Sequence, residues 1–341
     1  MSRVTISGTG AVSPAGWGVA ALMEMLRSGV KAEDSMVERK TADDRLIASP
    51  VARVPKLMDK SLLPKNPRLR RTSPIGKFAA AAAFEALGPE RLAAAQAGEI
   101  RVGVICSLMN GCVNYSNRFY GEVLGDPAFA SPILFPETVY NAPSSHLSAI
   151  LGSMAPNDTL VGDGAEIFTA LEVATEWLLR GDCEVCVVVA PEEIDWLSAE
   201  AVGLRSAEIT PSEGAGAVVL ELDGNGPTLL AIPDPVSYSE LGDRTEALRK
   251  LRGEFSVDEE STLLADSRIG VAWVDAIEDA VFGDWKGARI STKSLLGDAL
   301  GASASLQLVA AVEMLKAGEA EQAMVTSLGG NEQAGGCLLG R

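Results

Sequence analysis

Histidine is almost absent from this chain. Its 341 residues contain one histidine, five cysteines and only 5% aromatic side chains. A single imidazole leaves no set of histidines that could ligate a metal ion. Five cysteines are few and odd in number, which favours free thiols in a reducing compartment over a disulfide framework. We therefore expect no metal ion and no other cofactor.

Long apolar runs are also missing. We find no uninterrupted apolar stretch of about 18 residues that could span a bilayer, and the N-terminus lacks the pattern of a secretory signal. Basic residues number 29 against 46 acidic ones, and the formal net charge of −17 disfavours nucleic acid as the main ligand. The sequence predicts a cytoplasmic protein without membrane or nucleic-acid partners.

Apolar residues, in contrast, make up 47% of the chain, enough for a large buried core. Short β-branched runs alternate with alanine- and leucine-rich stretches of helical spacing. This alternation predicts an α/β protein with mostly parallel, buried sheets. The expected strands are 4–7, 102–106, 159–161, 186–190, 217–222, 228–232, 269–273, 289–291, 323–327 and 336–339, and the clearest helices are 164–179 and 303–315.

The chain also carries signs of an internal duplication. Residues 178–189 (LLRGDCEVCVVV) and 314–327 (MLKAGEAEQAMVTS) each run from a helix end through a glycine into an apolar strand. A polar seam at 223–227 separates the two, so we expect an N-terminal half over residues 1–223 and a C-terminal half over 224–341. The acidic segment 234–266 lacks a strong apolar period and is expected to be a surface excursion.

Cys183 and Cys186 form a Cys-x-x-Cys pair at the head of an apolar strand. Residues three apart on a strand point to opposite faces, and no second pair completes a ligand set. We interpret them as two buried or half-buried thiols rather than a metal or redox site.

Six segments stand in a fixed order along the chain: VTISGTGAVSPAGWG (4–18), RRTSPIGKFAAAAAFEAL (70–87), SPILFPETVYNAPSSHLSAILG (131–152), APNDTLVGDGAE (155–166), SEGAGAVVLEL (212–222) and STKSLLGDALGASAS (291–305). Together they resemble the β-ketoacyl synthase family of condensing enzymes, over nearly the whole chain. The resemblance implies a thiolase-like fold of five layers, α-β-α-β-α, with two pseudo-repeated halves.

The resemblance also shows which catalytic groups are missing. In the family, a cysteine at the N-terminus of a buried helix receives the acyl group, and two histidines polarise the malonyl thioester carbonyl. Here Gly164 stands at the nucleophile position. Ser267 and Asp298 stand at the two histidine positions, and only Lys293 of the catalytic set survives, close enough to Asp298 for a contact. The resemblance therefore implies a chain without condensation or decarboxylation chemistry.

Other side chains could still react. His146 follows two serines, but adjacent residues seldom form a catalytic triad, and we interpret it as a structural histidine. Asp163 and Glu166 could be a carboxylate pair for hydrolysis, or simply acids favoured at a helix N-terminus. A thiol of Cys106 or Cys112 beside His146, at the mouth of the central helix, would overturn the interpretation of a silent chain.

Basic residues concentrate between 56 and 77, where seven lysines and arginines stand against one acid. They are either a solvated loop and helix start or a docking surface for an acidic partner, such as an acyl carrier protein or a partner subunit. The candidate docking residues are Lys60, Lys65, Arg68, Arg70 and Arg71. The segment 192–212 is shorter than in the family, which is expected to thin the wall over the substrate tunnel.

Three functions remain open. The first is an inactive partner, like a chain length factor, that forms a heterodimer with an active ketosynthase in fatty-acid or polyketide-type biosynthesis. The second is a stand-alone homodimer that binds an acyl thioester or a carrier protein. The third is a thioester hydrolase that uses Asp163, Glu166 or Asp298. In the family, dimers form along the strand before the nucleophile, which is Thr159, Leu160 and Val161 here.

Overall fold

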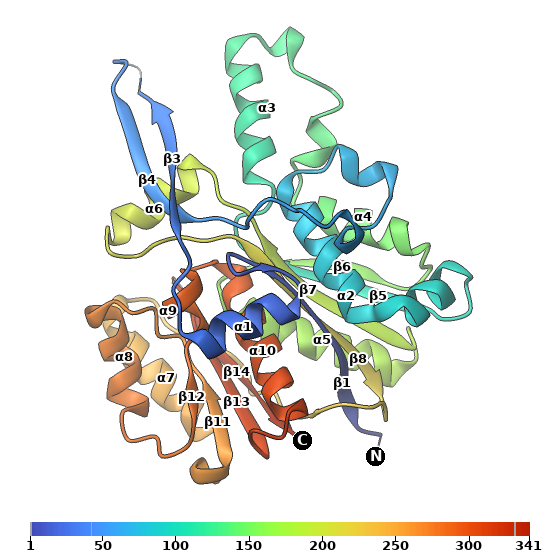
Figure 1. The fold of residues 1–341 in the computed structure, drawn as a ribbon, viewed down its shortest axis with the longest axis vertical. Helices are drawn as coiled ribbons and strands as arrows, with labels where there is room; N and C mark the ends of the chain where they lie inside the picture. Colours follow the sequence, from blue (N-terminus) through green and yellow to red (C-terminus); the bar gives the residue numbers. More distant parts are fainter. Residues whose placement is uncertain (1, 42, 331) are drawn as a thin grey trace.

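The computed structural model describes residues 2–41, 43–330 and 332–341. A layered body carries two projections at one end, the hairpin β3–β4 and the arm that begins with α3 (Figure 1). The helices are α1 (Val19–Ser28), α2 (Pro74–Gln96), α3 (Val113–Gly125), α4 (Ala142–Leu151), α5 (Glu166–Arg180), α6 (Trp196–Arg205), α7 (Arg244–Gly253), α8 (Ala272–Phe282), α9 (Thr292–Leu296) and α10 (Gly301–Lys316). The strands are β1 (Val4–Ser13), β2 (Gly16–Trp17), β3 (Asp34–Lys40), β4 (Leu46–Ala52), β5 (Val102–Leu108), β6 (Asn157–Val161), β7 (Val185–Glu192), β8 (Gly214–Leu222), β9 (Thr228–Ala231), β10 (Val236–Ser237), β11 (Thr262–Ala265), β12 (Arg289–Ile290), β13 (Gln322–Leu328) and β14 (Gln333–Gly340).

The main sheet consists of two halves with the same strand order. The first half runs β6-β5-β7-β8-β1 and the second β12-β11-β13-β14-β9, and the two meet where Thr5 pairs with Thr228. In each half the first three strands are parallel, and the fourth is antiparallel to both of its neighbours. This repetition confirms the pseudo-repeated halves; the boundary at residue 223 stays a prediction.

The expectation of mostly parallel sheets is wrong, because five of the nine pairings along this path are antiparallel. The reason is visible at β13 and β14, which are joined by a turn of only four residues. So short a connection can join only antiparallel neighbours, whereas parallel strands need a crossover.

Three helical layers enclose the two half-sheets. Helices α2 and α4 cover the outer face of the first half, and α7 and α8 cover the outer face of the second. Helices α5 and α10 lie between the half-sheets in a shared apolar core. Along β7, Val187 packs in the outer core and Val188 in the central one, the period-2 alternation of a strand buried on both faces. The molecule therefore has the five-layer, thiolase-like fold that the resemblance implies.

Glycines in β1 let helix α2 pack directly on the strand. A Cβ added at Gly8 would lie 1.9 Å from the carbonyl oxygen of Ala86, and one at Gly10 would lie 1.9 Å from that of Ala82. Any side chain at either position would force the two elements apart. The opening segment of the chain is thus fixed by backbone contact rather than by side-chain packing.

The structure corrects two predicted segments. The strand expected at 269–273 is wrong, because helix α8 begins at Ala272. The strand lies earlier, as β11, inside the segment 234–266 that we expected to be a surface excursion. That segment also contains α7, which buries Leu248 and Leu251 on one face. The apolar stripe of α7 is narrow and β11 has only four residues, so the acidic composition of the segment concealed them.

The two cysteines of the Cys-x-x-Cys pair do not point to opposite faces. A Cβ at Gly103 would lie 3.0 Å from Sγ of Cys183 and 3.2 Å from Sγ of Cys186, so both thiols fill one space beside β5. The strand argument fails because β7 begins only at Val185, after the first cysteine. Both thiols are free and buried. Within the described residues, no group of three or more potential ligands could hold a metal ion.

Candidate functional site

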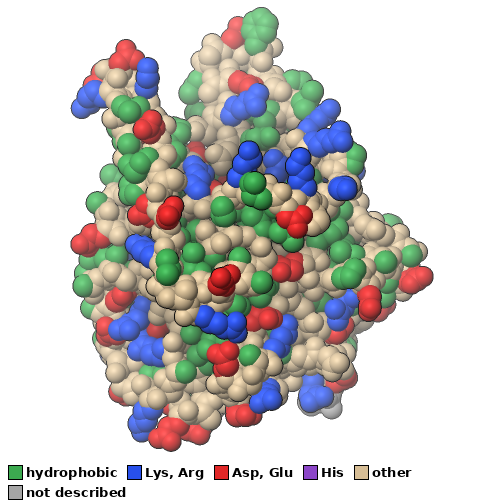
Figure 2. Space-filling view, viewed as in Figure 1, with side chains coloured by type: hydrophobic (Ala, Val, Ile, Leu, Met, Phe, Trp, Pro, Cys, Tyr) green, Lys and Arg blue, Asp and Glu red, His purple; other side chains and the backbone are tan. Residues whose placement is uncertain are grey.

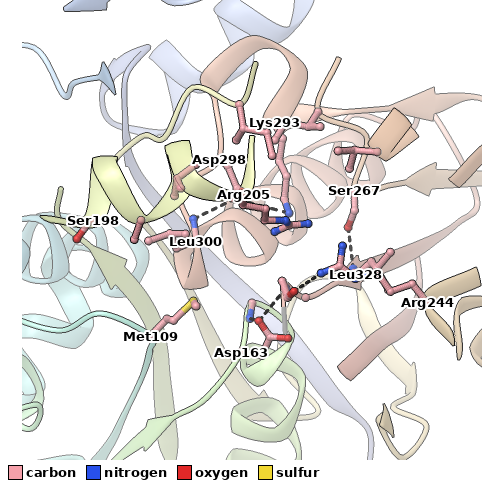
Figure 3. A pocket seen from close by; sticks show the side chains of 18 of the residues that line it. Met109, Asp163, Ser198, Arg205, Arg244, Ser267, Lys293, Asp298, Leu300 and Leu328 are labelled. Atoms are coloured by element: carbon pink, nitrogen blue, oxygen red, sulfur yellow. Dashed lines mark hydrogen bonds and ion pairs between the residues drawn. The ribbon is translucent and has the colours of Figure 1, made fainter. Parts of the chain in front are cut away.

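A cavity of about 250 Å³ lies between residues of both halves of the chain (Figure 3). Its walls come from the segment before α5, helix α6, the loop before α10 and the turn between β13 and β14. The polar side chains on these walls are Asn110, Asp163, Ser198, Arg205, Arg244, Ser267, Glu278, Lys293 and Asp298. Three further cavities of the described residues gather fewer groups capable of chemistry.

The four residues that the sequence placed at the family's catalytic positions all line this cavity: Gly164, Ser267, Lys293 and Asp298. They come from three separate segments of the chain, and the fold brings them together. Their one-to-one equivalence with the family's cysteine, histidines and lysine stays a prediction.

Gly164 lies two residues before helix α5. A Cβ built there would lie 3.6 Å from the carbonyl oxygen of Leu300, an ordinary van der Waals distance, and the backbone of Gly164 is not left-handed. Neither space nor conformation therefore requires glycine at this position. A Cβ would fit, so the backbone itself does not explain why a glycine stands here.

The buried carboxylate of Asp163 accepts hydrogen bonds from backbone N–H groups around Gly164. Its Oδ1 accepts hydrogen bonds from the backbone N–H of Gly164 (2.8 Å) and of Gly330 (2.9 Å). Its Oδ2 accepts from the N–H of Glu332 (2.8 Å) and of Gln333 (3.3 Å). N–H groups from the start of α5 and from the β13–β14 turn would suit the oxygen of an acyl-transfer intermediate. Here an internal anion already binds them.

The hydroxyl of Ser267 both donates and accepts a hydrogen bond within the protein. Its hydroxyl donates to the carbonyl oxygen of Thr326 (3.3 Å) and accepts from the N–H of Leu328 (3.0 Å). The side chain therefore ties the segment after β11 to β13 and does not present a free donor to the cavity.

Lys293 and Asp298 face each other, with Nζ and Oδ1 3.8 Å apart, which confirms the expected contact. Asp298 also accepts from the N–H of Leu300 and the hydroxyl of Ser303, both at 3.1 Å, so it ties the loop before α10 to the first turn of that helix. The carboxylate of Asp298 therefore has a structural role.

Glu278 is buried, and neither of its carboxyl oxygens has a hydrogen-bond partner. Burial raises the pKa of Glu278 to about 8; the nearby Asp266 raises it further, and Lys293 opposes the shift. The carboxyl group is therefore mostly protonated at neutral pH.

The remaining reactive candidates lie elsewhere. Nε2 of His146 is 2.8 Å from Oε2 of Glu137, and Oε2 of Glu166 accepts from Nε2 of Gln333 (3.0 Å). Burial raises the pKa of the Cys106 thiol to about 12, which keeps it uncharged and unreactive. None of these groups lines the cavity, and no thiol or imidazole does so in the part of the chain that the structure describes.

Sequence reasoning missed the wall formed by α6. The short segment 192–212 was expected to leave the cavity thinly covered, yet it folds into a helix that contributes Ser198 and Arg205 to the lining. Arg244, at the start of α7, lies in the segment misread as an excursion. Neither arginine belongs to a recognised motif, so only the fold could place them.

Two surface predictions can be located. Thr159, Leu160 and Val161 lie on strand β6. This strand stands at the outer edge of the first half of the sheet and pairs only with β5. The basic patch, defined as Lys56, Lys60, Lys65, Arg68, Arg70, Arg71 and Lys77, is exposed except at half-buried Lys77. Among the described residues none of the seven makes an ion pair. Figure 2 shows basic side chains gathered below the α3 arm.

Comparison with known proteins agrees with this geometry. The model of the β-ketoacyl synthase N-terminal domain matches residues 1–223. The chain belongs to this family. No curated protein sequence matches it. Helices long and apolar enough to cross a bilayer are not found in the described part of this family member.

Solved structures of ketosynthases share its fold at low sequence identity. The ishigamide ketosynthase/chain length factor aligns with a TM-score of 0.80 and 20% identity over 99% of both chains. AntDE:AntF, a type II PKS acyl-carrier protein in complex with its ketosynthase, aligns at 0.79 and 17% identity over 99% of both chains. A β-ketoacyl synthase from Burkholderia phymatum aligns at 0.75 and 16% identity over the full length of both chains.

Proposed function

We propose that this protein is a catalytically inactive β-ketoacyl synthase homologue that acts as the non-catalytic partner of an active ketosynthase, as a chain length factor does. The pathway would be fatty-acid or polyketide-type biosynthesis. The observation that carries the proposal is the cavity at the N-terminus of α5. It keeps the family's architecture, but a glycine stands at the helix mouth and the described lining offers no thiol or imidazole.

Acyl transfer needs a nucleophile and donors for the developing oxyanion. Gly164 supplies no nucleophile, and the N–H groups of Gly164 and Gly330 are bound to Asp163. Loss of a single oxyanion donor costs about 10²–10³ in rate, so several simultaneous losses favour a silent site. Hydrolysis is a weaker candidate, because Asp163 and Asp298 are committed to backbone N–H groups and Glu166 does not line the cavity.

The surface around β6 supports a partner subunit. Within the described residues one edge of this strand has no neighbouring strand, and such an edge readily pairs with another chain. Val161 at its end is 51% exposed. The arm from α3 to η4 (Phe135–Glu137) adds further exposed apolar side chains, namely Tyr120, Leu124, Phe129, Ile133 and Phe135. Together these features suit a large interface with a second thiolase-fold chain.

Co-expression with an active ketosynthase from the same organism tests the proposal. The tagged chain should carry the ketosynthase through affinity and size-exclusion steps as a stable heterodimer. Val161→Lys should abolish that association, because a charge at a buried strand edge is costly. Leu179→Lys, at the similarly exposed end of α5, is the control and should leave the heterodimer intact. A chain that remains a homodimer beside the ketosynthase would contradict the proposal and favour a stand-alone acyl-thioester or carrier-protein binding protein.

The basic patch supports an acidic carrier protein as a second partner. Seven cations without ion pairs within one surface segment create a positive field on a chain of net charge −17. The triple variant Lys60→Glu, Lys65→Glu, Arg68→Glu should weaken binding of the pathway's acyl carrier protein at least tenfold at low salt. The double variant Lys31→Glu, Lys40→Glu, which reverses exposed charges elsewhere, should not change it. Equal weakening by both variants would mean that only net charge matters.

A further inference from the structure

Two arginines converge on the cavity, and the proposed partner role uses neither. Arg205 is the last residue of α6 and Arg244 the first residue of α7. Both line the cavity beside the β13–β14 turn (Figure 3). Arginine is the side chain best suited to bind an anionic group through paired hydrogen bonds.

Arg244 is buried at 1% exposure, which is unusual for a guanidinium. Its Nη2 donates to the carbonyl oxygen of Gly330, and its guanidinium carbon lies 5.6 Å from the centre of the Tyr238 ring. Its Nε is buried without a hydrogen-bond partner. Burial, and then the positive charge of Arg205, lower the pKa of Arg244. One donor of this buried cation is therefore unsatisfied.

Arg205 borders the same turn. A Cβ added at Gly330 would lie 3.1 Å from Nη1 of Arg205, so both guanidinium groups border one glycine. Arg205 forms no ion pair among the described residues. The carboxylate of Asp163 lies nearby, but it already accepts four backbone hydrogen bonds. Two adjacent cations with spare donors remain at the cavity wall.

The rest of the cavity restricts the kind of anion. Lys293 and Asp298 offset each other, Glu278 is mostly neutral, and the Asp163 carboxylate offsets one of the two arginines, so an excess of positive charge remains at the arginines. The remaining wall is largely apolar, formed by Met109, Ile209, Ile269, Val274, Leu300 and Leu328. A volume of about 250 Å³ admits only a small molecule.

We propose that this cavity binds a short carboxylate, with the carboxylate group between Arg205 and Arg244 and a short hydrocarbon chain against the apolar wall. The ligand is held without turnover, which rests on the proposed function for the absence of chemistry. It could be a free acid or the terminal carboxylate of a short acyl thioester. The anion would relieve the repulsion between the two guanidinium groups.

Isothermal titration of the purified chain with hexanoate tests the inference. A Kd of about 0.1–1 mM is expected for a ligand of this size. Hexanamide, which has the same shape and no charge, should bind at least tenfold more weakly, as should inorganic phosphate, which lacks a chain. Titration with glutaryl-coenzyme A and with free glutarate distinguishes a thioester ligand from a free acid. Whichever of the two binds more tightly identifies the natural form of the ligand.

Variants assign the binding to the arginines. Arg205→Ala alters an exposed side chain, so it should fold normally and weaken hexanoate binding about tenfold or more. Arg244→Lys keeps the charge but loses the planar donor set, and should also weaken binding. Arg249→Ala, one turn or so along α7 and paired with Glu246 at the surface, is the control and should change nothing. Undetectable hexanoate binding at 10 mM, equal binding of hexanamide or phosphate, or an unchanged Kd in Arg205→Ala would overturn the inference. None of these results would affect heterodimer formation, so the two proposals fail separately.

Discussion

Replacement of Glu278 by glutamine should stabilise the protein at alkaline pH and change little at acidic pH. The carboxyl group is buried without a hydrogen-bond partner, and its pKa is raised from 4.5 to about 8. The folded state therefore binds this proton more tightly than the unfolded state does. Its contribution to stability is complete below pH 4.5 and is lost as the pH rises to about 8.

The size of the effect follows from that shift. Each unit of pKa difference corresponds to about 1.4 kcal/mol, so the full penalty of ionisation is on the order of 4 kcal/mol at pH 8. Glutamine has nearly the same shape and no charge to lose. Relaxation around the site will reduce the gain, so we expect Glu278→Gln to be about 2–4 kcal/mol more stable than the natural protein at pH 8, and equally stable at pH 4.5.

Urea unfolding followed by tryptophan fluorescence between pH 4.5 and pH 8.5 measures the difference. Glu192→Gln is the matched control, because the pKa of Glu192 is also raised to about 8 by burial. Its carboxylate accepts the N–H groups of Met109 and Asn110, so an amide there loses hydrogen bonds and should gain less. A difference between Glu278→Gln and the natural protein that does not grow with pH would refute the reasoning.

Three further predictions concern the site and the core. Gly164→Cys should fold but stay unacylated by acyl thioesters in intact mass spectra, because Asp163 binds the backbone N–H donors. Adding Asp163→Ala should raise acylation of the cysteine at least a hundredfold. Acylation of the single variant would show that Asp163 does not block the site. Gly8→Ala should cost about 3 kcal/mol or more in thermal unfolding, because its Cβ would collide with the backbone of Ala86; an unchanged Tm would mean that α2 can shift freely. Arg289→Ala should destabilise the chain by about 3–5 kcal/mol in urea unfolding, because it leaves buried Asp266 without its 2.7 Å ion pair, whereas Arg249→Ala at the surface should cost less than about 1 kcal/mol.

The sequence predicted the layers of the fold because buried strands and the two central helices carry strong apolar patterns. Residues 303–315 are almost wholly buried in α10, and helical spacing alone located them. The weakly patterned segment of α7 and β11 escaped, since one narrow apolar stripe among acidic residues resembles a loop. Cys183 was misplaced by the assumption that the strand had already begun.

Part of the candidate site could be predicted from the sequence, and part of it could not. Gly164, Ser267, Lys293 and Asp298 sit in recognisable motifs, and the fold brings them to one cavity. Arg205 and Arg244 come from segments without a motif, and their convergence depends on where α6 and α7 begin and end. The hydrogen bonds from Gly330, Glu332 and Gln333 to Asp163 likewise depend on the β13–β14 turn folding back onto the start of α5, a contact between residues at least 167 positions apart.

The most direct test of the central claim is to incubate the purified chain with acyl and malonyl thioesters of the pathway's carrier protein, and to record the intact mass and the release of carbon dioxide. We predict no acyl adduct and no carbon dioxide above the buffer background, while the partner ketosynthase gives both under the same conditions. An adduct that maps to the cavity, or carbon dioxide released at a steady rate by the chain alone, would contradict the account.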